Sequence, residues 1–385
     1  MKISITLWKL NYNITIHKFF KVEDMRNKVF DIMKGILIIL VVYGHCGLPL
    51  NHFIYLFHVP VFFMISGYYI KPEYFENRIS VREYFYKKIK SLWLPYFLFN
   101  GIGCLLNNFF VYIHFLKETD KKNVESIGID ILKTFLFRGG AKNIGGATWF
   151  LRTLFEVSII FIICGYLFRW FRNSSLYLQI KTKIGSDWLY YLDFIVLSFL
   201  FFLLILFGEY LCPHIDDCLK ISFILPLIYL GYVIKQLKIS DMINKPQISC
   251  IVLFCSLLLL IILNHLGTIE LAKNEITNSI FFLFCCIFGW CFIYSLSWLI
   301  NHIPILSNIL AFIGESSLSI MLFHFLLFKF VNLFIVTIQN LSYVDISAFP
   351  TLKGNSLWGI LYIVVGVVVP CLLYQMKKKI MRKIK

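Results

Sequence analysis

Residues 26–45, RNKVFDIMKGILIILVVYGH, decide the class of fold. Charged side chains are concentrated before Gly35, and no charged residue follows between Lys34 and His45. A helix that crosses the hydrocarbon of a bilayer needs about 20 mostly apolar residues. The stretch therefore predicts a membrane-spanning helix over residues 33–50, with ionisable groups at its beginning and a histidine near its far end.

The composition of the whole chain supports the same class. Of its 385 residues, 59% are hydrophobic and only 15% are charged, and the mean hydropathy is +0.77. A soluble domain of this size could not bury so many apolar side chains in one core. These values exclude a soluble enzyme and a disordered protein. The net charge of +16 comes from short basic clusters between apolar runs, a pattern that sets the orientation of membrane proteins, so we expect a lipid bilayer and no nucleic acid as partner.

Ten stretches of the chain are apolar enough to be membrane-spanning helices. We therefore predict an all-α, polytopic membrane helix bundle with about ten transmembrane helices. The predicted spans are residues 33–50, 53–70, 92–113, 147–168, 189–208, 219–234, 248–266, 277–299, 309–337 and 356–375.

The distribution of Lys and Arg predicts which side each loop faces. With ten spans, 26 of these residues fall on the side of both termini and nine fall on the other side. Cytoplasmic loops are enriched in Lys and Arg, so both termini are predicted to be cytoplasmic. The protein is then expected to be a multi-pass component of a bacterial cytoplasmic membrane, with loop 114–146 outside.

One membrane domain, residues 26–376, accounts for most of the chain. Residues 1–25 are expected to be an N-terminal extension, either upstream of a true start at Met25 or an amphipathic interfacial segment, and residues 377–385 a basic cytoplasmic tail. Most cysteines lie in apolar runs and predict no disulfide framework. Cys212 and Cys218 flank a polar loop, where a disulfide, a metal site and two isolated thiols remain open. No set of residues has the spacing of a zinc site, so no metal is predicted.

Ionisable side chains inside spans are costly and tend to face a cavity or a partner. Lys34 and His45 are eleven positions apart, which at about 100° per residue leaves them within about 20° of one helix face. Asp31 shares that face. The short segment 46–52 predicts a tight turn, after which His58 should lie at a depth similar to that of His45. We interpret these groups as the wall of a cavity that has Asp31 and Lys34 at its cytoplasmic mouth.

Other polar residues of the spans are secondary candidates. Arg152 and Glu156 are four positions apart and can pair on one helix face, either as a structural ion pair or as a substrate contact. Ser317 and His324, seven positions apart in the ninth span, also share a face, with Glu315 and Lys329 expected nearer the ends. The remaining candidates are Ser66, below His58, and Trp149, which is also explained as an interfacial aromatic.

A basic cluster lies between the second and third predicted spans. Orientation by positive charge is a sufficient explanation for it. Binding of an anionic cofactor is the functional alternative, because Lys and Arg hold phosphates electrostatically. The cofactor candidates in the cluster are Arg82, Lys87, Lys88 and Lys90.

The motif RNKVFDIMKG at residues 26–35, leading into VVYGH at residues 41–45, resembles the opening of the integral-membrane acyltransferases of family 3. FHVPVFFMISGY at residues 57–68 is similar to the motif that follows in that family. The family's pattern of a basic residue, ten residues and a histidine falls on Lys34 and His45. The first hairpin is most similar to the sugar O-acetylases that include fucose O-acetylase-like proteins. Weaker similarities occur at residues 87–96, 149–151 and 313–324.

This resemblance implies an O-acyltransferase that moves an acyl group, usually acetyl from acetyl-CoA, to a hydroxyl of an envelope glycan or lipid-linked sugar. It implies that acyl-CoA docks near Lys34 and the basic cluster, and that His45 acts as general base or as a transient acyl carrier. His58 and His324 would assist by hydrogen bonding or proton relay. A proton-coupled transporter and a flippase of acylated intermediates remain rivals, because both also use intramembrane ionisable groups.

The chain departs from the family's pattern in two places. Lys34 stands where arginine is common, which still supplies a cation. Arg152 directly follows the Trp-Phe-Leu motif, where an uncharged residue is expected, so the role of the fourth span is left open.

Overall fold

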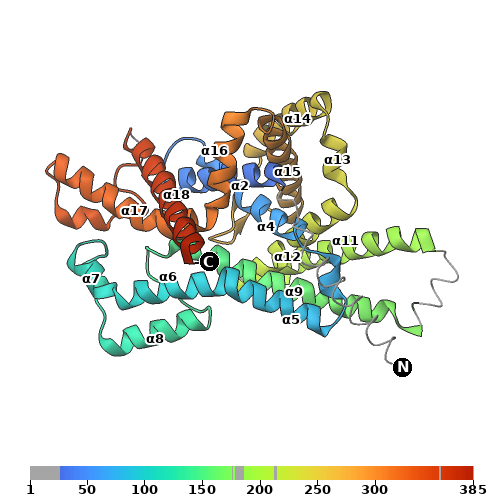
Figure 1. Cartoon of the computed structure of the whole chain (residues 1–385), viewed down its shortest axis with the longest axis horizontal. Helices are drawn as coiled ribbons and strands as arrows, with labels where there is room; N and C mark the ends of the chain where they lie inside the picture. The colour runs from blue at the N-terminus through green and yellow to red at the C-terminus, as the bar shows by residue number, and fades with distance from the viewer. Residues whose placement is uncertain (1–26, 176, 178–185, 212–214, 355–356, 385) are drawn as a thin grey trace.

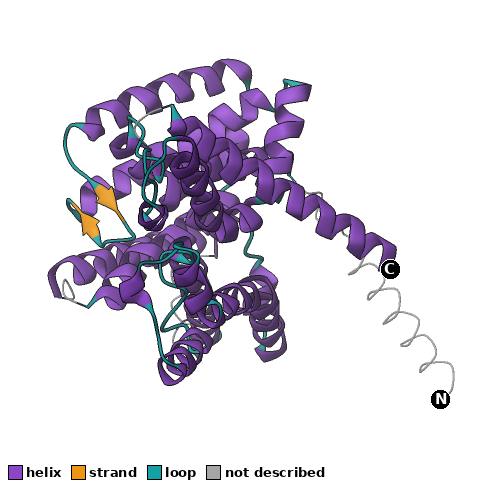
Figure 2. Ribbon diagram, turned by 90° about the vertical axis from the view of Figure 1, so that its left-hand side faces the viewer, coloured by secondary structure: helices purple, strands orange, loops and turns teal. Residues whose placement is uncertain are grey.

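The computed structural model describes residues 27–175, 177, 186–211, 215–354 and 357–384. Helices make up most of this part of the chain, with two short strands at one edge (Figure 2), as the prediction of an all-α protein requires. The predicted N-terminal extension and Cys212 lie outside the described residues, so their structure and the pairing of Cys212 with Cys218 stay open.

The first predicted hairpin is more divided than expected. Helix α2 spans Lys28–Gly44, and the Asn27 side chain caps it by accepting a hydrogen bond from the Val29 N–H. The second predicted span, 53–70, is not one helix: α3 covers Asn51–Tyr55 and α4 covers His58–Tyr68. Pro60 explains the break, because its ring clashes with the carbonyl of the residue four positions earlier in a continuous helix.

The third predicted span, 92–113, is also divided. A polar helix α5, Arg78–Lys88, continues through a π-helical turn, Ile89–Trp93, into α6, Leu94–Leu105, and is followed by α7, Asn107–Tyr112. Figure 1 shows α5 and α6 as one long rod, with α8 running back beside α6. Helix α8, Val124–Phe135, belongs to the predicted outer loop 114–146.

The remaining elements follow in chain order. They are α9 Trp149–Arg172, α11 Ser186–Leu211, α12 Asp216–Gln236, α13 Ile239–Ile243, α14 Pro246–Asn264, β1 Ile269–Glu270, β2 Glu275–Ile276, α15 Ser279–Ile300, α16 Pro304–Glu315, α17 Ser317–Ile338 and α18 Trp358–Ile384. Short 3-10 turns occupy Pro72–Phe75, Glu118–Asp120, Gly146–Thr148 and Tyr343–Ser347.

Within the described residues, six helices are long and apolar enough to cross a membrane. The total of ten spans and the cytoplasmic location of both termini therefore stay predictions. The ninth predicted span, 309–337, is divided at Ser316, where α16 ends and α17 begins. The six helices are those that include residues 146–172, 217–236, 246–264, 279–300, 317–338 and 358–383.

Glycine allows α2 to cross α16 at very close range. A Cβ atom at Gly35 would collide with the Leu310 carbonyl, and one at Gly314 would collide with the Asp31 carbonyl. Association of helices in lipid depends on such close backbone packing by small residues. Gly67 of α4 plays the same part against α12, where a Cβ atom would meet the Ile228 carbonyl. These crossings fix α2 and α4, which carry most of the candidate site.

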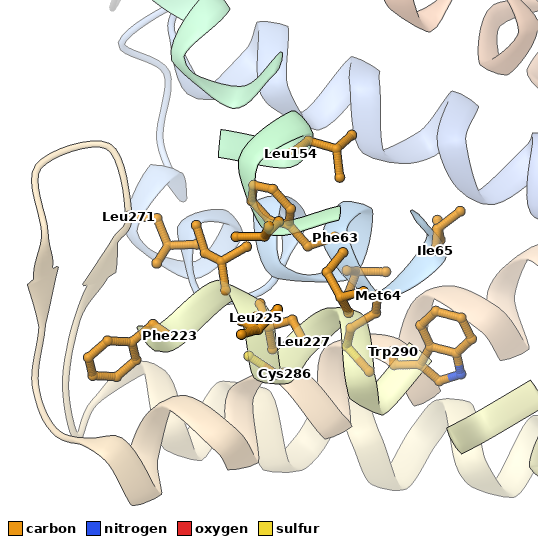
Figure 3. Packing of buried hydrophobic residues seen from close by; sticks show 14 of the residues in the cluster. Phe63, Met64, Ile65, Leu154, Phe223, Leu225, Leu227, Leu271, Cys286 and Trp290 are labelled. Carbon is orange, nitrogen blue, oxygen red and sulfur yellow. The ribbon is translucent and has the colours of Figure 1, made fainter. Parts of the chain in front are cut away.

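The largest hydrophobic core surrounds α4 and α12 (Figure 3). Phe63 and Met64 of α4 pack against Leu227 of α12, and Trp290 of α15 closes the cluster on one side. Leu271, from the turn of the β-hairpin, reaches the same cluster from the other side. The two short strands therefore belong to the packed body of the bundle.

Candidate functional site

A cavity of about 230 Å³ lies between α2, α4, α9 and α17. Most of its wall is apolar, with Ile38, Phe62 and Leu154 among the lining side chains. Few polar side chains line it, which is typical of pockets that orient a ligand with a small number of fixed polar groups. The lining residues with polar groups are Lys34, His45, Tyr55, His58, Ser66, Ser91, Trp149 and Ser317.

Lys34 and Asp31 form an ion pair beside the cavity. The Lys34 ammonium lies 2.7 Å from an Asp31 carboxylate oxygen and 5.8 Å from the centroid of the Tyr69 ring. The Asp31 side chain is buried and does not line the cavity, whereas Lys34 does. The buried carboxylate holds the ammonium at the cavity wall, where it can contact an anionic ligand.

His45 directly follows the last residue of α2 and lines the cavity. Its ring is stacked on that of His324, with centroids 5.6 Å apart and planes 15° apart, and it touches Phe325 at 4.7 Å. Among the described residues, no hydrogen bond occupies the ring nitrogens of His45. The imidazole can therefore exchange protons with a bound molecule.

His58 begins α4 on the opposite side of the first hairpin. Its Nδ1 lies 2.8 Å from the Ile54 carbonyl oxygen, which can only accept a hydrogen bond, so Nδ1 carries the proton and Nε2 has the lone pair. The Tyr55 ring packs edge-on against His58 at 5.0 Å, and the Tyr55 hydroxyl donates to the Gly44 carbonyl next to His45. Tyr55 thus links the two histidines, a role that the sequence did not indicate.

His324 lies on α17 and is completely buried. Its Nδ1 donates to the Ile320 carbonyl at 2.8 Å, which leaves the lone pair on Nε2. Within the described part of the chain, that Nε2 atom is buried without a hydrogen-bond partner. His324 does not line the cavity, but its ring stacks on that of His45, which does.

The hydroxyl and indole candidates line the same cavity as His45 and His58. Ser66, Trp149 and Ser317 all line the cavity, from α4, α9 and α17 respectively. The Ser66 hydroxyl donates to the Phe62 carbonyl one turn earlier. Trp149 therefore contributes to the cavity in addition to any interfacial role.

The basic cluster lies outside the cavity and leads into it. Its residues belong to α5 and the π-helical turn, and the next two residues, Ser91 and Leu92, line the cavity. Burial and the charge of neighbouring Lys87 lower the pKa of Lys88 to about 8. Several members rest on tyrosines: Arg82 on Tyr86, Lys87 on Tyr74 and Lys88 on Tyr84. Lys90 is exposed on the turn.

Arg152 and Glu156 form the predicted ion pair, with Nε and Oε1 3.1 Å apart. Arg152 also binds Asp217 of α12 at 2.6 Å, and Arg138 contacts the same carboxylate at 3.1 Å. These side chains do not line the cavity. The network ties α9 to α12, which supports the structural interpretation of the pair over a substrate contact.

The chain also matches a known protein family. The profile described as an acyltransferase domain matches residues 27–375. The chain belongs to the integral-membrane acyltransferase family 3. No curated protein and no solved structure matches it. It is thus a multi-pass membrane O-acyltransferase, and within its described residues no group of three or more His, Cys, Asp and Glu side chains is placed to hold a metal ion.

The β-hairpin closes one side of the acyltransferase cavity. Leu271 and Ala272, from its turn, are lining residues. Lys220 of α12 donates to the Ala272 carbonyl at 3.1 Å and lies 5.5 Å from the centroid of the Trp149 indole. The sequence does not indicate that this hairpin lies at the cavity, and only tertiary packing brings it there.

A second unpredicted feature of the acyltransferase is a strap formed by residues 343–350. Lys329 was expected near a helix end, but it is completely buried in the middle of α17 and donates to the carbonyls of Ser347 and Ala348. Asn332 donates to the carbonyls of Ile346 and Ala348. The expectation was wrong because the carbonyls of this segment provide the polar partners that hydrocarbon cannot.

The strap reaches the histidines through two phenylalanines. The Phe349 ring packs on Phe325 at 4.9 Å, and Phe325 touches both His45 and His324. Gly146 permits this arrangement, because a Cβ atom there would lie 2.9 Å from the Phe325 ring and 3.0 Å from the Phe349 ring. The strap thus supports the Phe325 ring, which packs against both histidines.

Proposed function

We propose that this acyltransferase moves an acyl group, acetyl in the first instance, from acyl-CoA to a hydroxyl of a cell-envelope glycan or lipid-linked sugar. One observation carries the proposal: Lys34 and His45 line the same cavity in a chain of this family. On one helix, eleven residues at 1.5 Å each separate them by about 16 Å. A cation for the cofactor and a base for the acceptor are then held at a fixed separation.

The cofactor is expected at the Lys34 side of the cavity. CoA is anionic because of its phosphates, and Lys34 together with the basic cluster provides the cations that favour it. Its flexible arm would run along the apolar wall and bring the thioester towards His45. The apolar wall excludes water, which favours transfer to the acceptor over hydrolysis.

In the proposed reaction, His45 passes a proton from the acceptor hydroxyl to the CoA leaving group. His45 removes the proton from the acceptor hydroxyl, and the oxygen attacks the thioester carbonyl carbon. The carbon–sulfur bond breaks, the new ester forms, and the proton passes from His45 to the departing CoA thiolate. His58 assists through its unprotonated Nε2, and His324 stabilises the His45 ring from behind.

An envelope acceptor is favoured by the character of the site. Three serines, a tyrosine and an indole line the cavity together with the two histidines, and these groups suit a hydroxyl-rich ligand better than an apolar one. A chain embedded in a bilayer meets such ligands as envelope glycans or sugars linked to lipids.

Mass spectrometry of envelope glycans, with and without the gene, tests the proposal. The expected result is the loss of an acyl mass from one glycan in the deletion strain and its return with the wild-type gene but not with His45→Ala. Purified protein should bind acetyl-CoA. An unchanged glycan profile together with no binding of acetyl-CoA by folded protein would favour the transporter or flippase instead.

A further inference from the structure

A second cavity, of about 310 Å³, lies between α9, α11 and α12 and shares no lining residue with the first. Figure 1 shows these three helices side by side. Two contacts define the relative direction of α9 and α11. Arg172 of α9 lies beside Asp193 of α11, and Phe161 lies beside Phe201, so the two helices are antiparallel. The cavity is therefore at the end of α9 that carries its two terminal arginines.

The two ends of this cavity differ in chemistry. Arg169 and Arg172, from the last turn of α9, line the mouth. The deeper wall is formed by Phe161, Leu197 and Phe201, which belong to the hydrophobic core or pack against it. A ligand that satisfies both ends must be an amphiphile with an anionic head and an apolar tail.

The charges at the mouth select the sign of the head. Asp193 is the acidic residue of the lining, and it already accepts from the Tyr177 hydroxyl at 2.8 Å and pairs with Arg172 at 3.4 Å. The Arg169 side chain is exposed and makes no hydrogen bond or ion pair within the described part of the chain. The mouth thus keeps an uncompensated guanidinium for a phosphate and offers no spare carboxylate for a cationic headgroup.

The length of the tail follows from the same geometry. A volume of about 310 Å³ is near the lower limit of the 300–1,000 Å³ usual for small-molecule sites, enough for a headgroup and the first part of one chain. Leu200, about 60° around α11 from the lining residue Leu197, is exposed and continues the apolar surface outwards. Such a face in a membrane contacts acyl chains, so a tail leaving the cavity stays in an apolar medium.

We propose that this cavity binds a phospholipid with a net negative headgroup, with its phosphate on Arg169 and Arg172 and the start of one acyl chain on Phe161, Leu197 and Phe201. Guanidinium groups bind phosphate in a bidentate manner, and basic pockets between membrane helices recognise anionic lipids. The site does not depend on the proposed acyl transfer. The bound phospholipid would contact α9, α11 and α12 and so hold the three helices together.

Native mass spectrometry of the detergent-purified full chain tests this with added phosphatidylglycerol and phosphatidylcholine. Wild-type protein should retain phosphatidylglycerol in excess over phosphatidylcholine. In the double variant Arg169→Gln, Arg172→Gln, the retention of phosphatidylglycerol should fall at least about tenfold. The matched control, Arg382→Gln with Lys383→Gln on exposed turns of α18, removes two charges elsewhere and should bind as wild type.

A second variant tests the cavity without changing charge. Cys164 lines the cavity and is exposed, so Cys164→Trp fills the space without rebuilding a core and should also reduce retention. Equal retention of both lipids by wild-type protein, or full retention by the double arginine variant, would overturn the proposal.

Two soluble probes distinguish other sources of the phosphate. If inorganic phosphate raises the melting temperature as much as phosphatidylglycerol does, the site recognises a free anion and the lipid is excluded. If coenzyme A displaces the bound lipid, the cavity belongs to the cofactor and the proposal fails. Because neither probe requires turnover, the result is independent of whether acyl transfer is observed.

Discussion

The imidazole rings of His45 and His324 lie nearly parallel, with centroids 5.6 Å apart, although they come from opposite ends of the sequence. His45 directly follows α2 and lines the cavity, whereas His324 is buried behind it on α17. From this arrangement we expect His45 to act on the bound substrate, and His324 to position the His45 ring and influence its protonation. This division of roles leads to distinct expectations for the two residues.

Replacing His45 by alanine should reduce acyl transfer by about 100- to 10,000-fold, the usual contribution of a general base. The swap is apolar and at a cavity wall, so insertion and folding should be retained. The measurement is transfer of labelled acetyl in membranes, with His302→Ala as control, since His302 is exposed and bonds only to its own helix turn at Trp298. Near wild-type transfer by His45→Ala would remove this residue from the mechanism.

The Nε2 atom of His324 should matter separately from its Nδ1. Asparagine retains an N–H donor near the Nδ1 position, so His324→Asn can still bond the Ile320 carbonyl while lacking the Nε2 lone pair. We expect the melting temperature to stay close to that of wild type and the pH dependence of kcat to change. A pH profile identical to that of wild type would restrict His324 to packing, and His324→Ala, which loses both functions, serves as the comparison.

Lys34 should govern the affinity for acyl-CoA. A charged hydrogen bond at a partly desolvated contact is worth roughly 1.5–3 kcal/mol, or about 10- to 100-fold in Kd. Lys34→Ala should therefore weaken acetyl-CoA binding by this factor, and Lys34→Arg should largely preserve it. Single changes at the exposed Arg82, Lys87 and Lys90 should cost less, because water screens those charges. Calorimetry in detergent measures the Kd of acetyl-CoA for each protein. A Lys34→Ala protein that binds as tightly as wild type would place the cofactor elsewhere.

Acetyl-CoA binding should weaken with rising pH near pH 8 if Lys88 contacts the cofactor. The lowered pKa of Lys88, about 8, means that the ammonium is present below that pH and is lost above it. Attraction for phosphate is then complete at pH 7 and reduced at pH 9. In Lys88→Arg the charge persists at both values, so the decline between them should disappear. A decline that is equal in both proteins would assign it to another group.

Lys329 should stabilise the strap of residues 343–350. Lys329→Met leaves the carbonyls of Ser347 and Ala348 without their donor, and a buried polar group left in this way costs about 1–3 kcal/mol. We expect a lower melting temperature and, through Phe349 and Phe325, slower transfer. Lys121→Met is the matched control, because Lys121 is exposed with only a 3.9 Å surface pair to Glu118, and should change stability little. Unchanged stability in Lys329→Met would show that the strap is held by other contacts.

The sequence determined the medium and the first helix of the site. Composition required a bilayer, and the spacing of Lys34 and His45 placed both on one face because a helix repeats its geometry over a few turns. The ion pair of Arg152 with Glu156 followed from the same local rule. Helix breaks were less predictable, because apolar runs such as residues 53–70 give no sign of how far each side of Pro60 will remain helical.

Only the tertiary structure decided which distant segments meet at the cavity. The stack of His45 on His324, the contact of Lys220 with the β-hairpin, and the support of Phe325 by the strap all join residues far apart in the chain. A periodic pattern states which face of a helix is polar but not which neighbour covers it. That choice depends on close packing, such as the crossing of α2 and α16 at Gly35 and Gly314, where the absence of a side chain lets two backbones touch.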